Sequence, residues 1–227
     1  MATNGFPLVV LDCDGTLVDS QAAICAVMHE CFAAHGLTPP EPVDVRRIVG
    51  LRLPDAIARL LTGPCTATPD EMAATYSRFS AMIRGRSTFT EPLYPGAREA
   101  VQGLSDGGCV LGVATGKSLR GLRETLSKHD LAHLFTTLQT SDIPPGKPHP
   151  DMLLRAIRET GAEAGATVMV GDTSYDMEMA RAAGTYAIGV SWGYHDAAAL
   201  AAAGAHRVIH TYADLGPAVR AVIGQVA

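Results

Sequence analysis

The sequence predicts an α/β protein: a doubly wound parallel Rossmann-like sheet with an inserted domain made only of helices. Short apolar runs typical of buried strands alternate with segments of helical periodicity over most of the chain. The apolar runs lack strict alternation, which indicates strands covered on both faces. Residues 20–86 interrupt this order and show only helical patterns. We therefore expect a core of residues 1–19 and 87–227 and a helical cap of residues 20–86.

Five apolar runs are the expected strands of the core, and they cover residues 6–11, 109–114, 136–140, 168–170 and 187–190. Helical periodicity appears beside these runs, in residues 96–106, 118–129, 150–161, 177–184 and 196–203. Because strand and helix alternate, the expected sheet is parallel, and right-handed crossovers place its helices on both faces.

The inserted segment shows helical spacing of its apolar residues and no strand signal. Residues 24–32 and 53–61 each place apolar side chains three or four positions apart. Residues 69–86 begin with Pro-Asp-Glu, which is a favoured start for a helix. We expect residues 86–95 to return the chain to the core, so that the helices form a lid above the strand ends.

The composition argues against several classes of protein. Eighteen Lys and Arg against 23 Asp and Glu give a net charge of −5, which disfavours a general nucleic-acid binder. No run approaches the roughly 18 apolar residues of a membrane span, and the N-terminus lacks the features of a signal peptide. Five cysteines without a Cys-x-x-Cys pair favour reduced thiols. We therefore expect a cytoplasmic protein with no membrane or nucleic-acid partner.

Polar residues follow three of the expected strands at the point where each strand ends. Asp12 follows the first, Thr115 follows the second, and Asp172 comes soon after residues 168–170. In open α/β sheets, ligands bind outside the carboxyl ends of the strands. We therefore expect these residues to meet in one crevice.

The first of these segments reads Asp12-Cys13-Asp14-Gly15-Thr16. Its two carboxylates are two positions apart, so they repel one another and favour a bound cation or a shared proton. Gly15 permits a sharp turn that exposes backbone N–H groups to an anion. A solvated Asp-Gly turn is the alternative interpretation.

The second segment, Thr115-Gly116-Lys117-Ser118, opens an expected helix. A hydroxyl beside the N–H groups of a helix N-terminus is suited to hold a phosphate. A P-loop requires glycine at the position of Leu111, so the spacing excludes that motif. Simple capping of the helix by Thr115 and Ser118 is the alternative.

Two further segments complete the pattern. Lys147 stands on a proline-rich loop, where its ammonium can bind carboxylates and phosphate as a point charge. Asp172 and Asp176 follow the run at 168–170 and enter a helix. Their carboxylates would complete an oxygen-rich magnesium site, whereas capping of that helix is the alternative role.

The four segments resemble, in order and over nearly the whole chain, the motifs of the haloacid dehalogenase superfamily. The matching residues are Asp-Cys-Asp-Gly-Thr-Leu-Val-Asp-Ser, then Thr115, then Lys147-Pro-His-Pro-Asp, then Gly-Asp-Thr-Ser-Tyr-Asp. The resemblance is nearest to the phosphoglycolate-phosphatase-like branch, which carries a helical cap between the first two motifs. It implies a Rossmann-like core and Mg²⁺-dependent hydrolysis of phosphate monoesters.

The resemblance also implies a role for each matching residue. Asp12 resembles the nucleophile that forms an aspartyl-phosphate, and Asp14 resembles the acid/base that protonates the leaving alcohol and then activates water. The Asp12 and Asp172 carboxylates and the Asp14 backbone carbonyl would ligate Mg²⁺, with Asp176 supporting the site. The groups implied to hold the phosphoryl oxygens are Thr115, the Gly116 N–H and Lys147.

Further residues are candidates for substrate binding. Gly116 stands where many relatives carry Asn, and Lys117 either supplies the missing donor or points into solvent. In the cap, Gly50 and Arg52 lie where relatives often place a substrate-reading loop, so they could grip a carboxylate or a second anion. A surface arginine is the alternative. The expected substrate is a small phosphorylated metabolite, such as phosphoglycolate, a nucleotide or a sugar phosphate.

Two other functions are compatible with these motifs. A sugar-phosphate mutase of the same superfamily keeps the acid at Asp14 and would move phosphate between positions on a sugar. A receiver-like domain would retain its aspartyl-phosphate, but the helical insertion would then be unexplained. The founding dehalogenases lack an acid at the position of Asp14, so its presence here favours a phosphatase.

Overall fold

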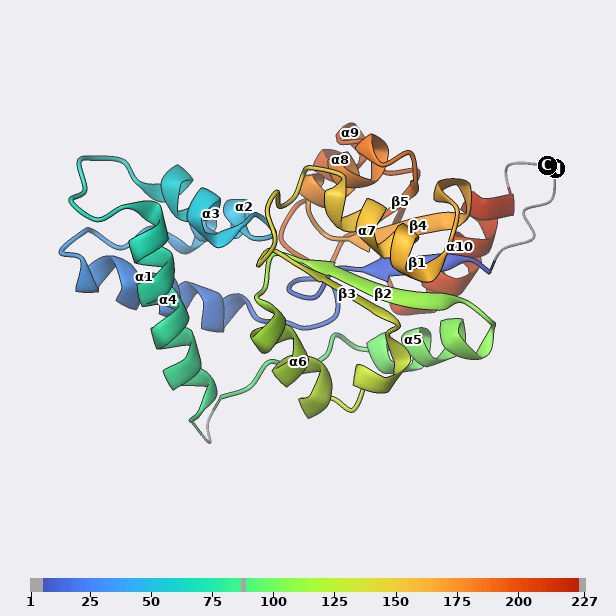
Figure 1. Ribbon diagram of the computed structural model, residues 1–227, viewed down its shortest axis with the longest axis horizontal. Helices are drawn as coiled ribbons and strands as arrows, with labels where there is room; N and C mark the ends of the chain where they lie inside the picture. The colour runs from blue at the N-terminus through green and yellow to red at the C-terminus, as the bar shows by residue number, and fades with distance from the viewer. Residues whose placement is uncertain (1–5, 87–88, 225–227) are drawn as a thin grey trace.

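The computed structural model describes residues 6–86 and 89–224, so the predicted domain boundary at residue 87 lies outside the described residues. Its central layer is a six-stranded sheet in which neighbouring strands are parallel (Figure 1). The strands are β1 Leu8–Leu11, β2 Val110–Thr115, β3 Thr137–Thr140, β4 Thr167–Gly171, β5 Tyr186–Val190 and β6 Arg207–Ile209.

The strand order, β3-β2-β1-β4-β5-β6, places a switch point between β1 and β4. From β1 the sheet grows outward to β3, and the chain then returns to the other side of β1 and continues from β4 to β6. Ligands bind at such a point, outside the carboxyl ends of the strands. The doubly wound parallel sheet predicted from the sequence is confirmed.

Helices cover both faces of the sheet and give the core three layers. On one face lie α5 Ala97–Asp106, α6 Leu119–Lys128 and α10 Leu215–Ile223. On the other lie α7 Asp151–Thr160, α8 Ser174–Ala182 and α9 Ala197–Ala202. Val10 and Leu11 of β1 pack into opposite layers, and both are fully buried. Burial on both faces explains why the strands read as continuous apolar runs.

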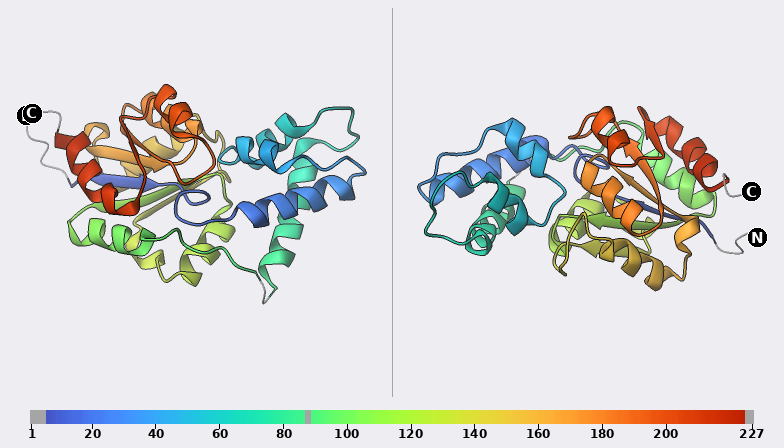
Figure 2. Two further views of the ribbon diagram at one scale, coloured as in Figure 1. Left: turned by 180° about the vertical axis from the view of Figure 1, so that it is seen from behind. Right: turned by 90° about the horizontal axis from the view of Figure 1, so that it is seen from above.

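A second group of helices lies beyond one end of the sheet (Figure 2). It comprises α1 Gln21–Ala34, α2 Pro42–Ile48, α3 Leu53–Leu60 and α4 Pro69–Arg84, and we call it the cap. The cap has its own apolar core, which includes Met28, Phe32, Ile57 and Met72. None of the described residues between 20 and 86 lies in a strand, as the helical periodicity predicts.

Some elements differ from the sequence expectation. The patterns do not predict β6, because three residues at a sheet edge are too few to show a period. They also do not predict α10, because its first turn contains Gly216 and Pro217. Helix α8 begins at Ser174, three residues before the expected start, because Thr173 caps it. Short 3-10 turns occupy Ala132–Leu134, Ala164–Ala166 and Tyr212–Asp214.

None of the helices in the described part of the chain has the length and apolar character needed to cross a membrane.

Candidate active site

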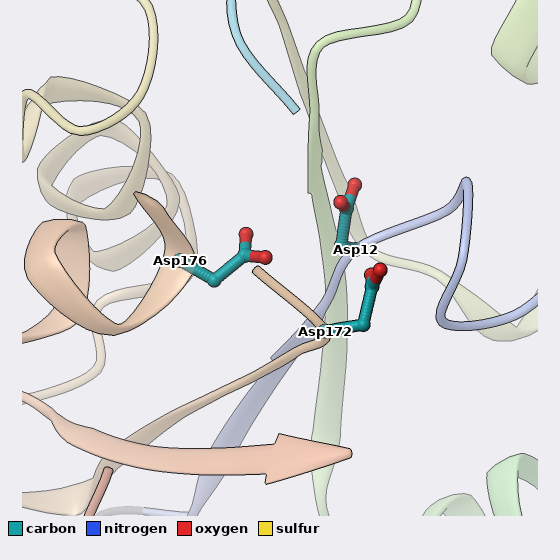
Figure 3. A group of neighbouring side chains, drawn as sticks. All are labelled: Asp12, Asp172 and Asp176. Atoms are coloured by element: carbon teal, nitrogen blue, oxygen red, sulfur yellow. The ribbon is translucent and has the colours of Figure 1, made fainter. Parts of the chain in front are cut away.

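Three buried carboxylates converge at the switch point of the sheet (Figure 3). Asp12 directly follows β1, Asp172 directly follows β4, and Asp176 lies in the first turn of α8. One oxygen from each side chain lies within 4.8 Å of the others, and no member is more than 1% exposed. The parallel strands thus bring together acids that are distant in the sequence, as the strand-end pattern predicts.

Backbone and hydroxyl donors hold two of these acids in place. Asp176 Oδ2 accepts from the Thr173 N–H at 3.0 Å in a capping box at the start of α8. Asp172 Oδ1 accepts from the Thr16 hydroxyl at 2.8 Å, and its Oδ2 accepts from the Tyr194 N–H at 2.9 Å. Asp176 therefore caps its helix with one oxygen and still directs the other into the acidic cluster.

Lys147 is the cation of this cluster. Its buried Nζ lies 3.0 Å from Asp12 Oδ2 and 2.6 Å from Asp176 Oδ1. Burial raises the pKa of Asp12 to about 7; the ammonium of Lys147 opposes the rise, whereas the nearby acids add to it. Burial also raises the pKa of Asp172 well above its usual value, and the charges of Asp12 and Asp176 raise it further.

This charge balance fits a divalent cation. Three carboxylates face one ammonium, so three negative charges against one positive give the fully ionised cluster a net charge of −2. The raised pKa values of Asp12 and Asp172 reflect the free-energy cost of that excess negative charge in a buried site. Carboxylate oxygens are the ligands that Mg²⁺ prefers, so the residues present suit the predicted metal.

The Asp14 carboxylate has a different set of partners from the clustered acids. Its Oδ1 accepts hydrogen bonds from the Ser20 hydroxyl and from Lys117 Nζ, both at 2.6 Å. Burial raises the pKa of Asp14, but the charge and hydrogen bond of Lys117, together with Ser20, lower it by more. The pKa of Asp14 therefore lies below its usual value, and the side chain is ionised beside Lys117.

Lys117 is buried, so the alternative that it points into solvent is wrong. Its side chain is 6% exposed, and its Nζ contacts the carboxylates of Asp14 and Glu91. Thr115, the last residue of β2, is also buried, and its Oγ1 accepts a hydrogen bond from the Lys117 N–H. A residue predicted to bind substrate thus contacts the residue predicted to be the acid/base.

A cavity of about 470 Å³ lies between the core and the cap. Its lining from the core includes Asp12, Asp14, Thr115, Gly116 and Lys117. Its lining from the cap is partly apolar and partly basic, and includes Met28, Gly50, Arg52, Leu53, Tyr76 and Arg84. A molecule bound beside Asp12 would therefore contact both domains.

The connection between α2 and α3, residues 49–52, rests on loops of the core. A side-chain carbon at Gly116 would lie 2.6 Å from the Leu51 carbonyl oxygen and 2.9 Å from that of Gly50. Gly50 itself has a φ of +100°, which favours glycine. The glycine at position 116 therefore lets the cap approach the end of β2 closely.

We expect the substitution Gly116→Ala to reduce activity and to lower the stability of the protein. The added methyl group would meet backbone oxygens of the cap, so the cap loop must move away from the site. A misplacement near 1 Å lowers kcat/KM by roughly 10- to 100-fold. The measurement is kcat/KM for p-nitrophenyl phosphate beside a thermal unfolding curve.

The matched control is Gly103→Ala in the middle of α5, where an added carbon meets no atom within 4 Å. This control should keep full activity and gain roughly 0.5–1 kcal/mol of stability, because alanine favours the helix. Unchanged kcat/KM in Gly116→Ala would show that the cap loop does not rest on residue 116 during turnover.

Three residues that contact the site acids, and one that contacts Lys117, carry no role in the sequence analysis. Thr16 and Ser20 donate to Asp172 and Asp14, and their place in the first motif was the available signal. Tyr194 lies outside the four motifs and donates its backbone N–H to Asp172. Glu91, which contacts Lys117, has no local pattern that marks it.

The fold and the site together define a doubly wound α/β enzyme whose helical cap covers an acidic centre suited to a divalent cation. The family model described as haloacid dehalogenase-like hydrolase matches residues 9–190. The chain belongs to this family of hydrolases. The family resemblance carried by the four motifs is thereby confirmed.

Two curated relatives match most of the chain. The protein named probable phosphatase IndB of Dickeya dadantii is 32% identical over 220 residues, which cover 96% of this chain and 95% of that protein. A phosphoglycolate phosphatase of Agrobacterium fabrum is 32% identical over 192 residues, which cover 84% of this chain and 82% of that protein.

Solved structures share the fold at lower sequence identity. A hydrolase from Pseudomonas syringae has a TM-score of 0.82 and 23% identity, with coverage of 97% of this chain and 99% of that chain. A haloacid dehalogenase-like family hydrolase from Streptococcus pneumoniae has a TM-score of 0.80 and 22% identity, with coverage of 94% and 98%. These likenesses support the same sheet and cap arrangement.

Proposed function

We propose that this protein is a Mg²⁺-dependent phosphatase that hydrolyses a small phosphate monoester through an aspartyl-phosphate on Asp12. The convergence of Asp12, Asp172 and Asp176 at the switch point, with Lys147 paired to Asp12 and Asp176, is the observation that carries the proposal. Its relatives named as phosphatases point to the same chemistry, and the protein is accordingly a phosphatase of the haloacid dehalogenase-like family.

In the first half-reaction, an oxygen of Asp12 attacks phosphorus while the bond to the leaving oxygen breaks. Asp14 donates a proton to that oxygen, so the product leaves as a neutral alcohol. Beside Lys117, Asp14 is ionised, but the negative charge of a nearby phosphate raises its pKa and favours the protonated acid.

In the second half-reaction, a water molecule attacks the phosphorus of the aspartyl-phosphate. Asp14, now a carboxylate, accepts a proton from that water. The bond between phosphorus and the Asp12 oxygen breaks, which releases inorganic phosphate and restores the Asp12 carboxylate. Asp14 thus serves as acid and then as base, and the cycle closes without a net change in the protein.

The chain offers ligands for both the cation and the phosphoryl group. The Asp12 and Asp172 carboxylates and the Asp14 backbone carbonyl would hold Mg²⁺, with Asp176 beside them. When bound, Mg²⁺ supplies positive charge that offsets the negative charge of the phosphoryl oxygens in the transition state. Thr115, the Gly116 N–H and Lys147 would hold these oxygens in line with Asp12.

The cavity supports a small metabolite as the substrate. With its phosphate at Asp12, the leaving group would extend toward the cap, where Gly50 and Arg52 also line the cavity. We propose that Gly50 and Arg52 contact the leaving group, and that a second anionic group would bind to the guanidinium of Arg52. The five cysteines are free in the structure, which supports a cytoplasmic location.

A panel of phosphate esters tests this proposal. Phosphoglycolate, nucleoside monophosphates and sugar phosphates are each incubated with the protein and Mg²⁺, and released phosphate is measured over time. We expect steady release from at least one small ester and loss of that release on addition of EDTA. Interconversion of sugar phosphates without phosphate release would instead identify a mutase, and a stable phosphoprotein would identify a receiver-like domain.

A further inference from the structure

A chain of charged side chains, mostly shielded from solvent, connects the cap to the carboxylate of Asp14. Glu91 lies in the connection between α4 and α5 and is 3% exposed. Its Oε1 lies 3.2 Å from Lys117 Nζ, and the same Nζ lies 2.6 Å from Asp14 Oδ1. The ammonium of Lys117 is therefore held between two carboxylates, one from the first motif and one from outside all four motifs.

The Glu91 carboxylate also contacts Arg84 and Thr125. Arg84, the last residue of α4, directs Nη2 at Glu91 Oε1 at 3.3 Å and Nη1 at Oε2 at 3.4 Å. The Thr125 hydroxyl of α6 donates to Oε2 at 3.2 Å. Two carboxylates, Asp14 and Glu91, thus alternate with two cations, so the set is charge-balanced although most of it is shielded from solvent.

The position of Lys117 depends on this arrangement. A lysine has a flexible four-carbon stem, so a single contact leaves its ammonium free to swing. Glu91 provides the second contact, and Arg84 and Thr125 fix the Glu91 carboxylate in turn. Lys117 Nζ donates a short hydrogen bond to Asp14 Oδ1, so movement of Lys117 would alter that hydrogen bond.

We propose that Glu91 is a positioning residue that acts through Lys117 to hold the Asp14 carboxylate in place for proton transfer to the leaving group. The inference rests on the proposed role of Asp14 as the acid. An alkyl leaving group needs that proton, whereas p-nitrophenolate leaves readily without it. Loss of Glu91 should therefore impair the hydrolysis of an alkyl phosphate far more than that of p-nitrophenyl phosphate.

The substitution Glu91→Gln tests this proposal, because it removes the charge and nearly preserves the shape. The measurement is kcat/KM, which reports the steps through departure of the leaving group, for p-nitrophenyl phosphate and for an alkyl phosphate that the unmodified protein hydrolyses. We expect a fall of roughly 10- to 100-fold for the alkyl ester and of less than about threefold for the aryl ester. Glu99→Gln, at an exposed position of α5, is the matched control and should change neither value.

A double-mutant cycle shows whether Glu91 acts through Lys117. We expect Lys117→Met to lower the ratio of alkyl to aryl kcat/KM at least as much as Glu91→Gln does. If Glu91 and Lys117 act as one unit, the ratio of alkyl to aryl kcat/KM in the double variant lies no more than about threefold below the ratio in Lys117→Met alone. Multiplicative losses in the double variant would contradict the proposal.

The remaining outcomes separate the inference from the function on which it rests. An equal fall in kcat/KM for both esters in Glu91→Gln, or no fall for either ester, would overturn the positioning role of Glu91. If Glu91→Gln does not fold, an unchanged ratio in Lys117→Met would overturn it as well. Phosphate release that persists in Asp12→Asn would overturn the proposed function itself, whatever the ratio.

Discussion

The substitution Asp12→Asn is expected to abolish phosphate release. The amide is a poor nucleophile, so the aspartyl-phosphate cannot form, while the size of the side chain is kept. Loss of the group that forms the covalent intermediate lowers kcat by at least about 1,000-fold. The measurement is phosphate release from the best ester of the panel, together with acid-quenched detection of the phosphoprotein, which the variant should lack.

The same variant should remain folded. In the absence of Mg²⁺, Asp12 belongs to a cluster of three carboxylates, and it shares the ammonium of Lys147 with Asp176. Because burial disfavours its charged form, removal of that charge should leave the metal-free protein at least as stable as the unmodified one. Asp130→Asn, at an exposed left-handed position that suits asparagine, is the matched control and should keep full activity. Activity in Asp12→Asn within tenfold of the unmodified protein would contradict the assigned nucleophile.

Mg²⁺ should stabilise the protein, and Asp172→Asn should remove this effect together with the activity. Binding to the folded state at 100 times the dissociation constant contributes about 2.7 kcal/mol. For a chain of this size, that free energy corresponds to a rise in melting temperature of roughly 5–10 °C. Thermal unfolding with Mg²⁺ and with EDTA measures the effect, and phosphate release is followed in the same samples.

Asp106→Asn is the control for this experiment, because Asp106 is exposed at the end of α5, outside the acidic cluster. It should keep both the activity and the Mg²⁺-dependent rise in melting temperature. A full Mg²⁺-dependent rise in Asp172→Asn would show that the cation binds elsewhere. A protein that is active and equally stable in EDTA would contradict the metal site altogether.

The sheet was predictable because burial on both faces leaves a strong local signal. Val9, Val10 and Leu11 are all fully buried, so β1 appears in the sequence as an uninterrupted apolar run. The three residues of β6 carry no such signal, since Arg207 is exposed and the strand lies at the sheet edge. The predicted helical character of residues 20–86 also holds, because the cap helices each bury an apolar face in a shared core.

The acidic cluster was predictable for a topological reason. Residues that directly follow parallel strands lie at the same edge of the sheet, so Asp12 and Asp172 had to be close once β1 and β4 were neighbours. Asp176 lies close to both because helix α8 begins directly after its capping residue Thr173 and carries Asp176 in its first turn. The roles of these residues in catalysis remain predictions that the variants above test.

What the sequence by itself determined is therefore the parallel sheet, the helical insertion and the motifs at the strand ends, because each is encoded in a local pattern of apolar and polar residues. Only the tertiary structure decided the partners of Lys117 and the close approach of Leu51 to Gly116. These contacts join segments distant in the chain, and their pairing depends on how the cap packs against the core. This packing decides which residue pairs with a buried charge, and no local spacing in the sequence specifies that residue.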